Sequence, residues 1–127
     1  MTAAIDPTDV AAILHAAARA ECALTYAEVL NALGHAFTRP RMRALCVVLD
    51  DLDAAERGAG RPGLACLVVR ASDGLPGQGW WLGRRDFAGA FTGSAAAAYL
   101  AARQQAAFDR WAGERDAAAG PAPAPAR

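Results

Sequence analysis

Apolar residues recur at helical spacing through the first half of the chain. The first such stripe follows Asp6-Pro7, a pair typical of a helix start, and predicts a supporting helix that runs to about Cys22. Its members are Val10, Ile13, Leu14, Ala17 and Ala18. His15 lies beside this stripe, and because no second ligand stands at metal spacing, we expect a structural histidine.

A second helix is predicted to begin at Thr25. The run Thr25-Tyr26-Ala27-Glu28 is a capping box, in which the threonine hydroxyl and the glutamate each bond a backbone N–H at the helix start. Apolar residues then recur at helical spacing: Tyr26, Val29, Leu30 and Leu33. Gly34 can adopt the left-handed conformation that ends many helices, so this helix should have nine or ten residues.

A third, longer helix is predicted next, with Thr38 or Arg39 as its cap and Pro40 in its first turn. Its apolar face consists of Met42, Leu45, Cys46, Leu49 and Leu52. Arginines crowd its beginning: Arg39, Arg41 and Arg43. An acidic cluster follows at Asp50, Asp51, Asp53 and Glu56. Phosphates would repel these carboxylates, so only the N-terminal half of this helix should approach a nucleic acid.

An apolar run from Leu64 to Val69 lies between glycine-containing breakers and predicts a buried strand. Residues 72–79 are dense in turn formers, and Trp80-Trp81-Leu82 then predicts the returning strand of a hairpin. One tryptophan could be exposed and stack on a base or dock a partner. We favour the alternative that both pack against the helices, because large aromatic side chains dominate cores.

Ser94 is the predicted cap of a final helix that continues through Trp111. One side of this helix carries Ala97, Leu100, Ala101, Gln104, Phe108 and Trp111. The helix could close the domain or pair with its copy in a homodimer, and the first arrangement is the safer expectation. Residues 113–127 are rich in alanine and proline and are predicted to form a disordered tail.

The order helix, helix, strand and hairpin predicts an α+β fold, a winged helix-turn-helix with additional N- and C-terminal helices. Residues 1–8 are assigned to an N-terminal tail and residues 9–112 to one domain. Within it, the helix-turn-helix spans about 25–55, the wing about 64–82 and the C-terminal helix about 94–111.

Composition narrows the class of protein. A chain of 127 residues fits one domain, and 13 basic against 13 acidic residues give no net charge, so any nucleic-acid binding must come from local clustering. The three cysteines stand in apolar runs, which favours reduced thiols and a cytoplasmic protein. No apolar run reaches the roughly 18 residues of a membrane span. No phosphate-binding glycine loop, carboxylate pair or zinc spacing is present, so no cofactor, metal or catalytic residue is predicted.

The capping box, the Leu33-Gly34 pair, the arginine-rich helix and the placement of Cys66 ahead of Ser72-Asp73-Gly74 support a resemblance. Over about the middle half of the chain, the sequence resembles the C-terminal DNA-binding domain of the alkylguanine-DNA alkyltransferases and their alkyltransferase-like relatives. The resemblance implies that Tyr26 and the arginine cluster lie toward DNA. It also implies that Cys66 stands where the family has its acceptor thiol.

The chain departs from this family at the reactive cysteine. The family pattern is Pro-Cys-His-Arg, whereas here the run is Ala65-Cys66-Leu67-Val68. A thiol with no base or positive charge beside it in an apolar segment stays protonated. We therefore interpret Cys66 as a core residue, with alkyl transfer as a weaker alternative.

Two helices joined by a short turn are typical of the pair that reads DNA, in which the second helix enters the major groove. The arginine fork can bond phosphate or guanine with two N–H groups, although a solvated helix surface would carry the same residues. We predict a non-enzymatic transcriptional regulator that binds duplex DNA. Its DNA-binding residues are predicted to be Tyr26, Arg39, Arg41, Arg43, Arg70, Gln78, Arg84 and Arg85.

A protein-interaction adaptor on the same winged-helix scaffold is the alternative function. It would hold a protein partner with the acidic end of the third helix, with Trp80 and Trp81, or with the C-terminal helix. The net charge of zero favours this alternative, whereas a steep loss of binding with added salt would favour DNA.

Overall fold

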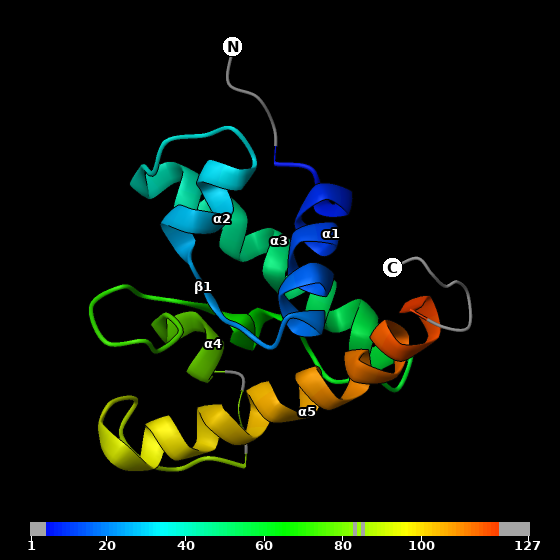
Figure 1. Ribbon diagram of the computed structural model, residues 1–127. Coiled ribbons are helices and arrows are strands. Elements are labelled where there is room, and N and C mark those ends of the chain that lie inside the picture. The colour runs from blue at the N-terminus through cyan, green and yellow to red at the C-terminus, as the bar shows by residue number, and fades with distance from the viewer. Residues whose placement is uncertain (1–4, 83, 85, 120–127) are drawn as a thin grey trace.

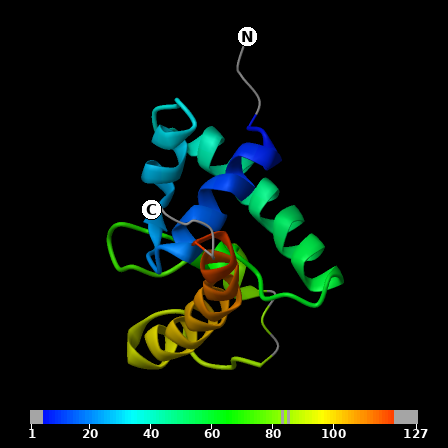
Figure 2. The same cartoon turned by 45° about the vertical axis from the view of Figure 1, so that its right-hand side comes forward.

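The computed structural model describes residues 5–82, 84 and 86–119. The helices are α1 (Pro7–Arg19), α2 (Tyr26–Ala32), α3 (Arg39–Gly58), the 3-10 helix η1 (Ala65–Leu67), α4 (Gln78–Leu82) and α5 (Gly93–Ala119), and the strands are β1 (Leu24–Thr25) and β2 (Val68–Val69). α1 packs on both α3 and α5, and α5 runs along the base of the molecule (Figures 1 and 2). The molecule is thus mainly helical with a small parallel sheet, which is compatible with the expected α+β class.

The predicted starts of α1, α2 and α3 are confirmed by their caps, whereas α5 begins at Gly93, so the predicted cap Ser94 lies inside that helix. The Thr25 hydroxyl accepts the Glu28 N–H at 3.1 Å, and the Glu28 carboxylate accepts the Thr25 N–H at 2.8 Å. The Thr38 hydroxyl accepts the Arg41 N–H at 3.2 Å, so Thr38 is the cap of α3. Gly34 has the expected positive φ of 87°. These signals are local in sequence, because a cap needs only residues within one helical turn.

The predicted hairpin wing is wrong. Only Val68 and Val69 of the apolar run form a strand, and they pair in parallel with Leu24 and Thr25. The expected returning strand is the helix α4, which buries Trp80 and Trp81. An apolar run buried on all sides suits either a strand or a short helix, so burial was predictable here and conformation was not.

Two acidic residues of α3 face inward. Asp53 and Glu56 are buried, whereas Asp50 and Asp51 remain exposed. One oxygen of the Asp53 carboxylate accepts the backbone N–H groups of Leu64 at 2.7 Å and Ala65 at 2.9 Å. Buried carboxylates need such partners. Asp53 therefore ties α3 to the start of η1.

The C-terminal helix is longer than predicted. α5 continues to Ala119, past the predicted end at about residue 111 and into the first part of the predicted tail. Residues 120–127 of that tail, like residues 1–4, lie outside the described residues. Its buried positions are Ala96, Leu100, Ala107 and Trp111, while Ala97 and Ala101 are exposed. α5 closes the core intramolecularly against α1 and η1.

No helix in the described part of the chain has the length and apolarity needed to cross a membrane.

Candidate functional site

A surface cavity of about 440 Å³ opens between the starts of α2 and α3 and the loop after β2. We call it the α2/α3 cavity. It is lined by Thr25, Tyr26, Ala27, Phe37, Arg39, Met42, Arg70, Ala71 and Ser72. Figure 1 shows the three contributing segments on one side of the molecule. Apolar walls with two guanidinium groups suit a flat or apolar group that carries negative charge beside it.

The three arginines at the start of α3 differ in their surroundings. Arg39 and Arg43 are exposed, and Arg39 also lines the α2/α3 cavity. Arg41 is half-buried, and its guanidinium donates to the Ala36 carbonyl at 3.0 Å. Arg41 thus stabilises the turn between α2 and α3, and Arg39 and Arg43 are the pair that an outside ligand can reach.

Arg70 is held by an acidic neighbour. Its guanidinium bonds both oxygens of Asp73, at 3.1 and 2.8 Å. The bond from Arg70 lowers the pKa of Asp73, and Asp73 also accepts the Leu75 N–H at 3.1 Å. The pair sets the shape of the loop that follows β2 and keeps Arg70 on the wall of the α2/α3 cavity.

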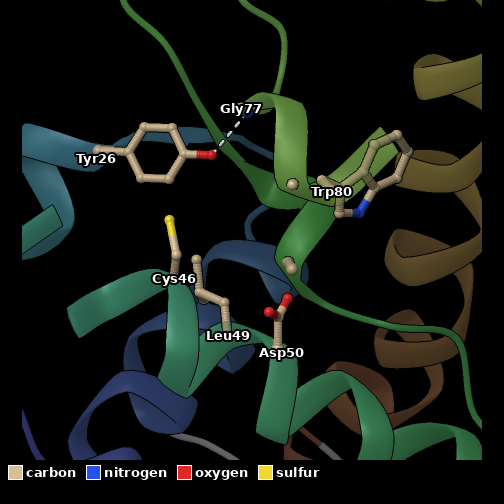
Figure 3. Close-up of a pocket in the computed structure, with 8 residues that line it drawn as sticks. Tyr26, Cys46, Leu49, Asp50, Gly77 and Trp80 are labelled. Carbon is tan, nitrogen blue, oxygen red and sulfur yellow. Dashed lines mark hydrogen bonds between the residues drawn. The ribbon is translucent and has the colours of Figure 1, made fainter. Parts of the chain in front are cut away.

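Tyr26 is part of the wall and does not project into solvent. Its ring is buried, and its hydroxyl accepts the Gly77 N–H at 2.9 Å (Figure 3). Burial raises the pKa of Tyr26 despite that hydrogen bond, so the phenol stays neutral at physiological pH. The ring separates the α2/α3 cavity from an inner cavity of about 60 Å³.

The inner cavity carries a thiol and a carboxylate from α3. Figure 3 shows the Cys46 sulfur directed toward the Tyr26 ring, with Asp50 nearer to Trp80. Burial, and then the charge of Asp50, raises the pKa of Cys46. Cys46 is therefore a neutral thiol and does not provide an activated nucleophile in the inner cavity.

The remaining predicted contacts lie elsewhere. Gln78 is exposed at the start of α4. Arg84 stacks over the Trp80 ring, 4.1 Å from its centroid, and lines a different cavity near Asp53. Arg85 lies outside the described residues. Of the eight predicted residues, the structure therefore brings Tyr26, Arg39 and Arg70 together around one cavity.

Cys66, the residue at the position of the acceptor thiol in the resembled family, is enclosed in the core. It is 3% exposed, and its sulfur lies 3.7 Å from the Gly63 carbonyl oxygen. Burial, and then the charge of Asp53, raises the pKa of Cys66 to about 12. At neutral pH it is a protonated thiol with little exposure, which makes it a poor nucleophile.

Sequence reasoning missed Phe37 and Met42 as walls of the α2/α3 cavity. Phe37 is 47% exposed in the turn before the Thr38 cap. An aromatic residue in a turn of this kind, outside any apolar stripe, was the available signal. Met42 was assigned to the core face of α3 and is half-buried at its edge.

Among the residues described, no three His, Cys, Asp or Glu side chains gather in a way that could hold a metal ion. Comparison with protein-family models, with curated proteins and with solved structures gives no match. A function must therefore be inferred from the geometry of the site.

Proposed function

We propose that this chain is a non-enzymatic DNA-binding protein that contacts duplex DNA with the start of α3. The supporting observation is that Arg39 and Arg43 are exposed in the first turns of a long helix that follows a shorter one. A helix placed this way can enter the major groove with its N-terminal residues, and a guanidinium group can bond phosphate or guanine there.

The distribution of acidic groups along α3 supports this orientation. Asp50 begins the exposed acidic segment seven residues beyond Arg43, which is about 10 Å along the helix. Asp53 is buried against η1, and Glu56 is paired with Arg61 at 2.7 Å. Fewer carboxylates therefore face a phosphate backbone than the sequence indicates, and the first turns of α3 remain positive.

In this proposal the loop between β2 and α4, in place of a hairpin wing, contacts DNA beside α3. Arg70 lies on the wall of the α2/α3 cavity, and Ala71 and Ser72 are exposed beside it. In this proposal the protein is a helix-turn-helix regulator of transcription that touches the backbone beside the groove with this loop. The buried, protonated Cys66 supports binding without alkyl transfer.

Binding of a fluorescently labelled duplex of mixed sequence, followed by anisotropy at low salt, tests the proposal. Each arginine that contacts DNA should contribute a factor of about ten or more to the affinity, so the double variant Arg39→Ala/Arg43→Ala should bind DNA much more weakly than the wild type. The slope of log affinity against log salt should fall by about 2, because two phosphate or base contacts are removed.

The matched control is Arg57→Ala/Arg103→Ala. It removes the same charge from exposed arginines, and Arg57 lies about 21 Å along α3 from Arg43. This variant should bind DNA like the wild type. Equal affinities for the wild type and the Arg39/Arg43 variant would reject the proposal.

A second candidate function is a protein-interaction adaptor. The observation that favours it is the apolar character of the α2/α3 cavity, with Phe37 exposed on its wall, in a chain of no net charge. Because Trp80 and Trp81 are buried, this cavity replaces them as the docking surface. A partner that stays bound after nuclease treatment and is lost with Phe37→Ser would support the adaptor, whereas loss of all partners with nuclease would support DNA.

A further inference from the structure

A third cavity, of about 230 Å³, lies where the C-terminal half of α3 meets α4 and α5. We call it the basic cavity because four arginines line it: Arg57, Arg61, Arg84 and Arg103. Asp53 and Trp80 also form part of its wall.

The charges around this cavity do not balance. Glu56 is bonded by Arg61 through two contacts, at 2.7 and 3.1 Å. Asp53 lies 3.7 Å from Arg84 and is already satisfied by two backbone N–H groups. Within the described residues, Arg57 and Arg103 have no carboxylate at ion-pair distance. Among the described residues, the four arginines of this cavity therefore outnumber the carboxylates paired with them, Asp53 and Glu56.

The Asp53 carboxylate is held by groups of the protein itself. Burial raises the pKa of Asp53, with the Leu64 and Ala65 hydrogen bonds and then Arg84 and Arg57 acting in the opposite direction. Arg84 and Arg103 also act on the nearby Cys66, whose pKa they lower against the effect of burial. Arg57, Arg84 and Arg103 therefore act electrostatically on two groups of the cavity wall, Asp53 and Cys66.

The walls also include the ring of Trp80. Trp80 is 9% exposed, and its indole N–H is buried without a hydrogen-bond acceptor in the part of the chain that the structure describes. Arg84 lies over the face of the same ring. Trp80 lines both the basic cavity and the inner cavity, so its ring contributes to the wall between α4 and α3.

We infer that the basic cavity binds a small phosphate-bearing anion, with Arg57, Arg84 and Arg103 around its phosphoryl oxygens. Guanidinium groups only donate hydrogen bonds, so the ligand must supply acceptors. A carboxylate has two oxygens, whereas a phosphoryl group has at least three and can meet several guanidinium groups at once. The volume is below that of most drug-sized sites, which favours phosphate itself or a small phosphorylated molecule.

Titration calorimetry of the full chain tests this site with three probes at matched ionic strength: inorganic phosphate, ribose 5-phosphate and acetate. The two phosphate probes should bind with a dissociation constant on the order of 1 mM or tighter, and acetate should bind at least tenfold more weakly. Tighter binding of ribose 5-phosphate would identify a phosphorylated small molecule as the ligand, and equal binding would identify phosphate itself.

The variant Arg57→Gln/Arg103→Gln should weaken phosphate binding at least tenfold. Both side chains are exposed, so circular dichroism should show an unchanged fold. Arg39→Gln/Arg43→Gln is the control and should bind phosphate like the wild type. No heat of binding up to about 10 mM phosphate, or equal binding by the Arg57/Arg103 variant, would overturn the inference. Neither result bears on DNA binding, which depends on the other pair.

Discussion

Burial separates the three cysteines into different chemical environments. Cys22 is exposed, Cys46 is half-buried and Cys66 is enclosed in the core. For Cys66, a pKa of about 12 leaves roughly one thiol in ten thousand ionised at pH 8. Since the thiolate is the reactive form, the low exposure and the low ionised fraction of Cys66 both protect it.

Alkylation with iodoacetamide at pH 8 should therefore modify Cys22 first and leave Cys66 intact in the native protein. Peptide mapping by mass spectrometry measures the extent at each cysteine, and denaturation in urea should make all three reactive. Incubation with DNA that carries an alkylated guanine should likewise leave Cys66 unmodified. Alkylation of native Cys66 at the rate of Cys22, or transfer of the alkyl group to it, would contradict its assignment as a core residue.

At the scale of elements, one carboxylate of α3 decides the conformation of the segment that follows. Asp53 accepts the N–H groups of Leu64 and Ala65, which lie at the start of η1. Gly63 makes this approach possible, because a Cβ atom there would stand 2.5 Å from an Asp53 oxygen. A segment predicted as a strand therefore turns into a 3-10 helix before it reaches β2.

Replacement of Asp53 by Ala should lower the free energy of unfolding by about 2–4 kcal/mol. The variant leaves two buried N–H groups without acceptors, which costs about 1–3 kcal/mol each. Part of this cost is offset, because the variant also removes a buried charge that is itself unfavourable. Urea denaturation followed by circular dichroism gives the difference.

Asp51→Ala is the matched control for this change. Asp51 is exposed on the same helix, so its loss should alter stability by no more than about 0.5 kcal/mol. Equal effects of the two substitutions would show that the Asp53 contacts do not hold η1 in place.

At the scale of the whole molecule, one apolar cluster joins all the helices. It includes Val10 of α1, Leu30 of α2, Leu45 of α3, Trp81 of α4 and Leu100 of α5. Trp111 extends this core along α5, where its ring lies 4.1 Å from that of His15. Gln104 adds a polar link by donating to the Cys66 carbonyl at 2.9 Å. Because helices α1 to α5 all contribute to this single core, we expect one cooperative unfolding transition.

The variant Trp111→Ala should keep that single transition and lose about 3–5 kcal/mol, because it removes a large buried ring between α5 and α1. Coincident urea curves from circular dichroism and tryptophan fluorescence check both statements. Gln105→Ala, at an exposed position of α5, should change stability by no more than about 0.5 kcal/mol. Separate transitions for the two signals would mean that α5 unfolds independently.

The sequence by itself determined the starts of α1, α2 and α3, the apolar faces of α1 and α2 and the burial of residues 64–69. Each of these depends on residues within a few positions of one another: Thr25 with Glu28, Thr38 with Arg41, or a run of consecutive apolar side chains. The tertiary structure decided what those segments became. The parallel partner of Val68 is Leu24, the acceptor for Ala65 is Asp53, and the hydroxyl that holds Gly77 belongs to Tyr26.

The same division applies to the candidate site. The sequence predicts Arg39, Arg43 and Arg70 as contacts, but it does not reveal the hydrogen bond that occupies Arg41 or the ring contact that holds Arg84. Helix caps and apolar periodicity are short-range and leave a trace in the local pattern. Contacts between segments that lie tens of residues apart leave none, because a hydrogen bond or a packed ring depends on positions in space that only the folded core provides.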